Sequence, residues 1–200
     1  MMNIISTIIL LSLITVSCNV LSTRDPESPD IGQNILVPAT SPSLVLANMK
    51  LSIESKNPNN LLLCLADTMR GSKLPFQFAP TAEINTRYAS LFFNWNVLNE
   101  RTSFQSLISK LPSDGGITLQ FQQIAYDVVN PDSVVILANY ELITNHQLQT
   151  IPKNAKGRLR FVCTQERGGI WSIQSWTDNT LSIVDSNSTS WSLFKAQFSN

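Results

Sequence analysis

Few residues in this chain could carry acid–base or metal chemistry. The sequence contains a single histidine, His146, and its three cysteines, Cys18, Cys64 and Cys163, lie far apart. Structural zinc sites use cysteine and histidine ligands at short, regular spacings. No such spacing occurs here, so we predict no metal site. His146 lies in the polar stretch 144–156, which we expect to form a solvent-exposed loop.

Carboxylates are the remaining candidates for a catalytic acid or base. A general base needs a protected pocket in which its pKa moves toward neutrality. Asp127 and Glu141 alternate with the apolar residues of two expected strands, so we expect them to point away from the core. Asp67 faces away from the leucines of an expected helix and should be solvated. Asp178 ends the last expected strand and is interpreted as a turn residue. We therefore assign no catalytic residue and no cofactor.

Two tyrosines have the strand parity of core-facing residues. Tyr126 and Tyr140 could donate hydrogen bonds inside a pocket, or they could pack with their hydroxyls at its edge. Trp171 is interpreted as a core or rim aromatic residue. Together with Asp67, these residues form the candidate pocket set. A buried acid beside either tyrosine would favour an enzyme, whereas a core filled by large side chains would favour a binding module.

The N-terminal residues have the pattern expected of an export signal. Residues 4–16 are uncharged and apolar, too short a run to cross ~30 Å of hydrocarbon but typical of a signal-peptide core. The run ends in Thr15-Val16-Ser17-Cys18, which resembles the lipobox of bacterial lipoproteins. The resemblance implies a signal peptide over residues 1–17, lipidation (palmitate) of Cys18 and a membrane anchor in the bacterial cell envelope. Asn19, in place of an aspartate, implies the outer membrane. An ordinary cleaved signal is the alternative.

Composition limits the remaining possibilities. The 200 residues are 43% hydrophobic and 14% charged, with 14 basic and 14 acidic side chains. A neutral chain without a basic stripe is a poor match for nucleic acid. Residues 18–40 are proline-containing and polar, so we expect a disordered tether. Residues 41–200 should then form one domain.

Helical patterns dominate the first half of this domain. The first helix should start at Pro42 and bury Val45, Leu46 and Met49. A second should follow from about Asn60 to residue 70, with a short strand at 76–78. The third should end near Leu111, with apolar residues recurring at helical spacing, namely Phe104, Leu107, Ile108 and Leu111.

Alternating patterns dominate the second half and predict long strands near 118–129, 134–142, 159–163 and 170–178. In the first of these strands, the apolar parity switches at Gln122-Gln123. Leu119 and Phe121 lie on one parity, whereas Tyr126 lies on the other. A β-bulge would bring them to the same face.

This order of elements resembles the nuclear transport factor 2-like superfamily. The segments carrying the resemblance are SPSLVLANMKLSIESKNPNNLLLCLAD, FNWNVLNERTSF, IWSIQSWTD and SWSLFKAQF, and they are also similar to a group of envelope lipoproteins of Bacteroidetes-like bacteria. This superfamily includes ketosteroid isomerase-like, SnoaL-like and cystatin-like members. The resemblance to it implies an α+β fold. Three N-terminal helices should pack in the concave face of a strongly bent, four-stranded antiparallel sheet, forming a cone.

Two functions remain open from the sequence. The first is a membrane-anchored, non-catalytic envelope lipoprotein whose domain binds a small apolar ligand or a protein partner. The alternative is a small pocket enzyme of isomerase, hydratase or cyclase type acting on a hydrophobic substrate, as in some members of the superfamily. Cys64 and Cys163 could pair in an oxidising compartment or remain as buried thiols.

Overall fold

The computed structural model describes residues 36–181 and 189–199. The predicted signal peptide, Cys18 and residues 19–35 of the predicted tether lie outside the described residues. Residues 36–40 lie against the domain, because Ala39 O accepts a hydrogen bond from Trp171 N at 2.7 Å. Within the described ranges, no helix is long and apolar enough to cross a membrane.

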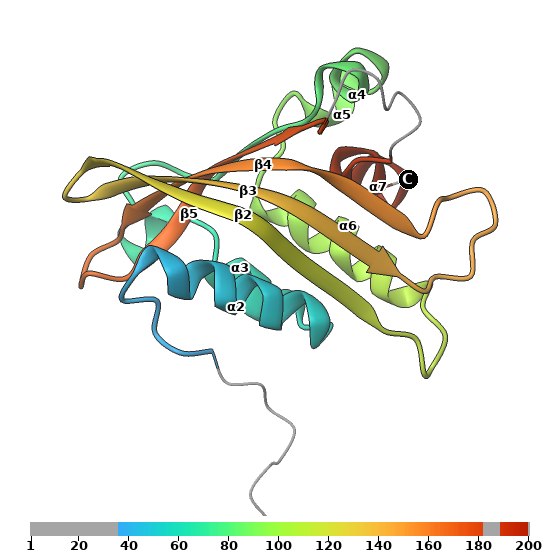
Figure 1. Cartoon of the computed structure of the whole chain (residues 1–200), viewed down its shortest axis with the longest axis horizontal. Coiled ribbons are helices and arrows are strands. Elements are labelled where there is room, and N and C mark those ends of the chain that lie inside the picture. Colours follow the sequence, from blue (N-terminus) through green and yellow to red (C-terminus); the bar gives the residue numbers. More distant parts are fainter. Residues whose placement is uncertain (1–35, 182–188, 200) are drawn as a thin grey trace, which may run out of the picture. The chain divides into compact units, whose positions relative to one another are not determined.

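The domain has an α+β architecture, in which short helices precede four long strands (Figure 1). The elements in chain order are α2 (Pro42–Glu54), α3 (Pro58–Leu63), the 3₁₀ helix η1 (Thr68–Arg70), β1 (Gln77–Ala79), α4 (Ala82–Arg87), α5 (Ala89–Phe92), α6 (Val97–Ser109), β2 (Ile117–Asn130), β3 (Ser133–Thr144), β4 (Asn154–Gln165), β5 (Trp171–Asn179) and α7 (Trp191–Gln197).

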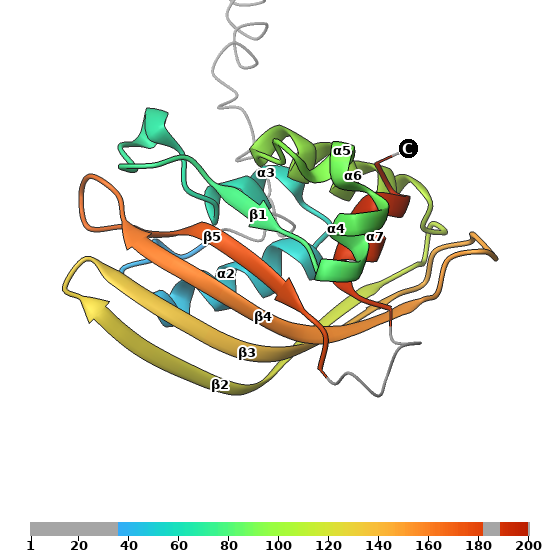
Figure 2. The same cartoon turned by 90° about the horizontal axis from the view of Figure 1, so that it is seen from above.

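The strands form one bent sheet with the order β1-β5-β4-β3-β2 (Figure 2). The four long strands pair in antiparallel fashion, as predicted. The sheet has a fifth strand, because β1 pairs in parallel with β5 through Phe78 and Trp176. This pairing places the Phe78 ring edge-on against the Trp176 ring, 5.3 Å between centroids. Burial of the two aromatic rings explains why so short a segment joins the sheet.

The predicted bulge in β2 is confirmed. Gln122 pairs with Asn139, but the next paired residue, Ala125, lies opposite Leu137, so β2 carries one extra residue. Gln123 takes up the irregularity with a positive φ of 51°. Tyr126 and Phe121 consequently lie on the same inner face of the sheet despite their different parity.

The second helix is shorter than predicted. We expected it to continue to residue 70, but α3 ends at Leu63. The backbone beyond it pairs with β5 instead, because Ala66 N donates to Ile173 O and Ile173 N donates to Cys64 O, both at 2.8 Å. Met69, which lies in the stretch predicted to continue the helix, is 92% exposed. Helices α4, α5 and α7 were not predicted.

Large side chains fill the space between the helices and the inner face of the sheet. Trp176 is 1% exposed, and its ring meets the rings of Phe161 and Trp191 edge-on at 5.3 and 4.6 Å. Cys64 and Cys163 are buried free thiols. Burial raises the pKa of each thiol to about 12, so neither is a reactive nucleophile.

Candidate functional site

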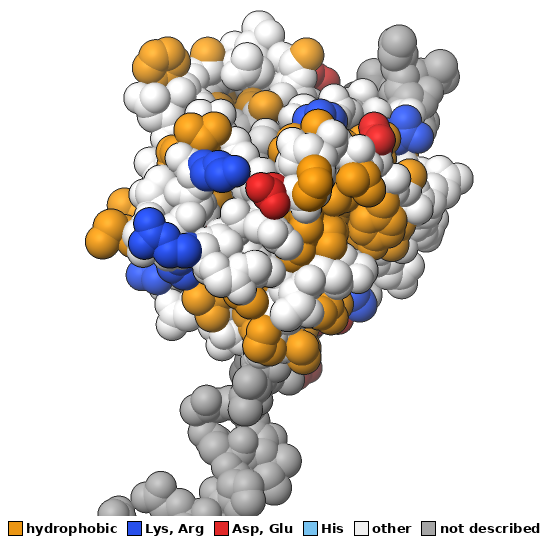
Figure 3. Space-filling view, turned by 90° about the vertical axis from the view of Figure 1, so that its left-hand side faces the viewer, with side chains coloured by type: hydrophobic (Ala, Val, Ile, Leu, Met, Phe, Trp, Pro, Cys, Tyr) orange, Lys and Arg blue, Asp and Glu red, His pale blue; other side chains and the backbone are white. Residues whose placement is uncertain are grey.

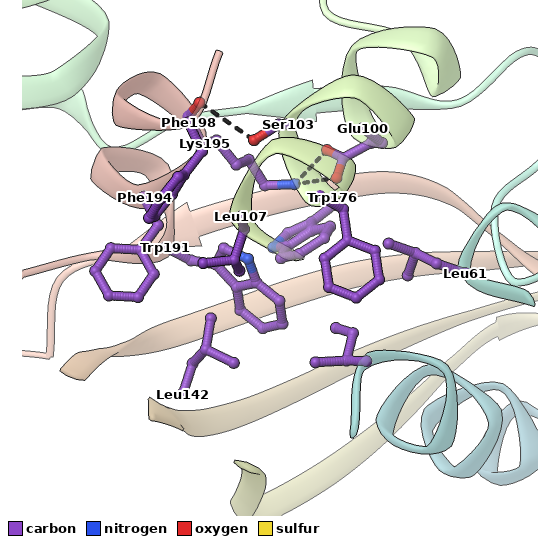
Figure 4. Close-up of a pocket in the computed structure, with 12 residues that line it drawn as sticks. Leu61, Glu100, Ser103, Leu107, Leu142, Trp176, Trp191, Phe194, Lys195 and Phe198 are labelled. Carbon is purple, nitrogen blue, oxygen red and sulfur yellow. Dashed lines mark hydrogen bonds and ion pairs between the residues drawn. The ribbon is translucent and has the colours of Figure 1, made fainter. Parts of the chain in front are cut away.

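A small cavity lies in the interior of the cone. It has a volume of about 30 Å³ and lies among α6, α7 and the sheet (Figure 4). Its walls include Glu100, Ser103, Trp176, Trp191 and Lys195. Ligand pockets in proteins usually measure about 300–1,000 Å³, whereas a water molecule needs roughly 10–15 Å³. The cavity therefore has room for water and not for an organic substrate.

A buried ion pair between α6 and α7 forms one side of this cavity. Glu100 and Lys195 are each 3% exposed, and the Lys195 ammonium donates to both Glu100 carboxylate oxygens. Trp95 Nε1 also donates to Glu100 Oε1, at 2.6 Å. Burial lowers the pKa of Lys195, and the nearby Glu100 charge opposes this shift.

Aromatic rings enclose the same ammonium group. Lys195 Nζ lies 3.8 Å from the centroid of the Trp176 ring and 4.4 Å from that of Phe78. Such cation–π contacts strengthen when they are desolvated. The charged groups of Glu100 and Lys195 are thus satisfied by one another and by the surrounding rings, and the pair fastens α7 to α6.

Asp178 is buried, so our interpretation of it as a turn residue was wrong. It is 1% exposed, and its Oδ1 accepts a hydrogen bond from the Tyr140 hydroxyl at 2.7 Å. Its Oδ2 accepts from Ser192 N at 2.7 Å and from Ser192 Oγ at 2.5 Å. Burial raises the pKa of Asp178 and also that of Tyr140, which is 2% exposed.

The inward direction of Asp178 follows from a further register shift, in the pairing of β5 with β4. Val162 pairs with Ser175, but Cys163 pairs with Ile173. The parity of β5 switches there, so Trp171 and Ile173 before the shift and Trp176 and Asp178 after it all face inward. Two residues, and not the single one of regular alternation, separate the inward-facing Ile173 and Trp176. The same change of parity located the bulge in β2.

Asp178 and Tyr140 hold the start of α7. Trp191 N donates to the Tyr140 hydroxyl at 2.8 Å, so the two side chains together satisfy the first free N–H groups of this helix. Both oxygens of Asp178 are engaged, and neither side chain lines the cavity. A buried acid beside a tyrosine is present, but it has no free position at which a reacting atom could approach.

His146 is fully buried, contrary to our expectation of an exposed loop residue. Its Nε2 lies 3.0 Å from Pro152 O, and its ring packs against Phe198 with the centroids 5.4 Å apart. The loop folds inward because the aromatic residues of α7 and the following residue cover it. His146 lines neither the cavity described above nor the groove described below.

The candidate pocket set does not form one site. Tyr140 lies in the core, and Asp67 accepts from Met69 N at 2.9 Å at the start of η1. Tyr126 and Trp171 do lie together in an open groove. The predicted outward direction of Asp127 and Glu141 holds, since Asp127 is exposed and Glu141 pairs with Lys156 at 3.0 Å.

The groove runs between α2 and β2, along residues 120–130 of the strand. It consists of two adjoining hollows of about 440 and 450 Å³ that share Ser43 and Tyr126. The other residues lining them are mostly apolar, namely Pro42, Leu46, Ala47, Lys50, Gln120, Phe121, Ile124, Val128, Asn130, Pro131, Val134 and Trp171. Figure 3 looks onto the end of the domain that carries the β2–β3 turn and shows hydrophobic side chains gathered there. Each hollow has the size of a ligand site.

No charged group in the groove is free to do chemistry. Lys50 Nζ is held by Glu54 Oε1 and by Leu119 O, both at 2.5 Å. Partial burial raises the pKa of Tyr126, so its phenol stays protonated at neutral pH. Within residues 36–181 and 189–199, no three His, Cys, Asp or Glu side chains come together as metal ligands.

Sequence reasoning missed Glu100 and Lys195. Glu100 lies one turn before Phe104 on the stripe that continues to Leu107, so its buried position was readable from the spacing on α6. Lys195 gave no such signal, because α7 was not predicted.

Comparison with known proteins bears on the fold. No family model and no curated protein matches the chain. A provisionally named aromatic ring hydroxylase from Novosphingobium aromaticivorans aligns with a TM-score of 0.51 at 9% identity, over 69% of this chain and 85% of that one. A provisionally named scytalone dehydratase from the same organism gives 0.51 at 10%, over 70% and 81%. A provisionally named dehydratase of the NTF2-like family from Streptomyces avermitilis gives 0.49 at 8%, over 70% and 93%.

Proposed function

We propose that this chain, whose domain has the nuclear transport factor 2-like fold expected from its sequence, is a non-catalytic envelope lipoprotein that holds a small apolar ligand in the α2–β2 groove. The observation that carries the proposal is the contrast between the two spaces in the domain. The cavity inside the cone has a volume of about 30 Å³, whereas each hollow of the groove exceeds 400 Å³ and is lined mainly by apolar side chains.

The engagement of the buried acids argues against catalysis. A general base contributes roughly 10²–10⁴ in rate, and it must reach the proton that it removes. Glu100 is occupied by Lys195 and Trp95, and Asp178 by Tyr140 and Ser192. The pocket-enzyme alternative draws support from the Asp178–Tyr140 pair, but α7 covers that pair and would have to leave first.

Binding to the groove can be tested with the fluorescent probe anilinonaphthalene sulfonate, an anion whose aromatic rings bind apolar surfaces. Val128 lines the groove and is 69% exposed, whereas Val129, next to it, is 60% exposed and lies outside the groove. We expect saturable binding to the unmodified protein and a loss of affinity of about tenfold for Val128→Glu, because the carboxylate would enter an apolar hollow. Val129→Glu adds the same charge and should leave the affinity unchanged. Equal effects of the two substitutions, or no saturable binding, would contradict the proposal.

The membrane anchor is proposed from the export segment, which ends at Ser17-Cys18. Several acyl chains on Cys18, each contributing about 0.8 kcal/mol per buried CH₂, would hold the domain at the outer membrane. Mass spectrometry of the membrane-extracted protein should find an acylated Cys18 as the first residue, and Cys18→Ala should leave the membrane fraction. A mature N-terminus elsewhere, without lipid, would rule out the anchor.

A further inference from the structure

The outer edge of β2 is open along its second half. β2 is the last strand in the sheet order. Near its start, α2 covers the edge, because Leu119 N donates to Glu54 Oε1 at 3.0 Å and Leu119 O accepts from Lys50. Beyond the bulge, no other described group bonds to the outward backbone of residues 124–128. A long, apolar edge of this kind favours pairing with another strand.

The residues that offer this edge follow from the ladder. In an antiparallel pair, successive residues direct their N–H and C=O groups alternately toward the partner strand and away from it. Leu119 directs its groups away from β3, and β3 continues without irregularity against β4. Beyond the bulge, the same alternation has Tyr126 and Val128 direct their backbone N–H and C=O groups away from β3. Ile124 has the same parity and should do likewise.

We propose that β2 pairs with β2 of a second copy of this chain, antiparallel and symmetric about Tyr126. This register uses all three outward residues, because Tyr126 lies opposite Tyr126 of the second copy and Ile124 lies opposite Val128. It also sets Asp127, the one charged residue of β2, opposite Ala125. A register centred on Asp127 would oppose two carboxylates, and one centred on Ala125 would leave Val128 unpaired.

The side chains of this stretch favour the same arrangement. Ile124, Tyr126 and Val128 are 44%, 48% and 69% exposed although they lie on the inner face of the sheet. In the symmetric dimer, the isoleucine of each copy would pack beside the valine of the other, as cross-strand apolar pairs do. The grooves of the two copies would meet at the axis. The dimer shares these three side chains with the groove, but it does not require the proposed ligand and is measurable without it.

The proposed register predicts opposite effects on the dissociation constant of the dimer for two substitutions at the exposed residue Ala125. Ala125→Lys would face Asp127 of the second copy twice in the dimer and should tighten the dissociation constant by about two- to thirtyfold. Ala125→Asp should weaken it by a similar factor. Asp127→Lys, added to Ala125→Asp, should restore the affinity, because the charges are then exchanged across the interface. Thr118→Lys, on the same strand outside the paired stretch, is the matched control.

Sedimentation equilibrium of the full-length protein, in a density-matched detergent, measures the dissociation constant. A dimer that strengthens with Ala125→Lys, weakens with Ala125→Asp and recovers in the double variant supports the proposed register. A protein that stays monomeric up to about 100 μM overturns the proposal, since that concentration corresponds to only ~5.5 kcal/mol of association free energy. A dimer that responds equally to both substitutions at Ala125 also overturns it.

Discussion

Removing one charge of the Glu100–Lys195 pair should destabilise the domain strongly. Glu100→Gln keeps an oxygen that can accept from Trp95 Nε1, but it leaves the Lys195 ammonium buried without a counter-charge. Breaking a buried ion pair in this way costs about 3–5 kcal/mol. The Trp176 and Phe78 rings, at 3.8 and 4.4 Å from Nζ, continue to stabilise the ammonium. We therefore expect a loss near the lower end, about 3 kcal/mol, out of a typical total of roughly 5–15 kcal/mol.

Urea unfolding followed by tryptophan fluorescence measures this loss at constant m-value. Burial already lowers the pKa of Lys195, and removal of the Glu100 charge should lower it further. The unfolded chain then binds more protons than the folded one between the lowered pKa and the ordinary lysine value, so the variant should regain stability as the pH rises through that window. The double variant Glu100→Leu/Lys195→Met should lie close to the unmodified protein, since apolar replacement of a buried pair is often neutral. A loss under about 1 kcal/mol for Glu100→Gln, or a double variant as unstable as the single one, would refute this account.

Two further substitutions test the contacts of Asp178 and Tyr140 that attach the start of α7 to the sheet. Between the ordinary aspartate pKa and the raised pKa of Asp178, the folded state binds more protons than the unfolded one, so the unmodified protein should lose stability as the pH rises. Asp178→Asn should remove this pH dependence. Urea unfolding at several pH values measures the free energy of unfolding, and an unchanged pH profile would contradict the assignment. Gly157→Ala would set its Cβ 2.5 Å from the Tyr140 hydroxyl and 2.7 Å from Asn179 O, so thermal unfolding should show a loss of about 1–3 kcal/mol. Gly116→Ala, which meets nothing within 4 Å, is its control.

The sequence predicted best where a single periodicity decides the structure. Strand alternation located the long strands and the bulge at Gln123, because a shift of one residue reverses every side chain beyond it. The same logic, applied to the spacing between Ile173 and Trp176, would have predicted that Asp178 faces inward. The error there lay in treating the last strand as regular.

Contacts between distant segments could not be predicted from local pattern. The end of α3 at Leu63 depends on hydrogen bonds with Ile173 of β5, more than a hundred residues later. The burial of His146 depends on Phe194 and Phe198. α7 was not expected as a helix, so neither its aromatic residues nor Lys195 could be placed. The α2–β2 groove was likewise beyond local pattern, although Tyr126 and Trp171 were named as pocket residues.

The position of α7 after all the strands in the chain order has a consequence for folding during biosynthesis. Lys195 lies 95 positions after its partner Glu100, and Trp191 lies 51 positions after Tyr140. A nascent chain that still lacks these residues would hold two carboxylates in an apolar interior with no helix to satisfy them. Stable packing of this interior would therefore have to wait until α7 has been synthesised.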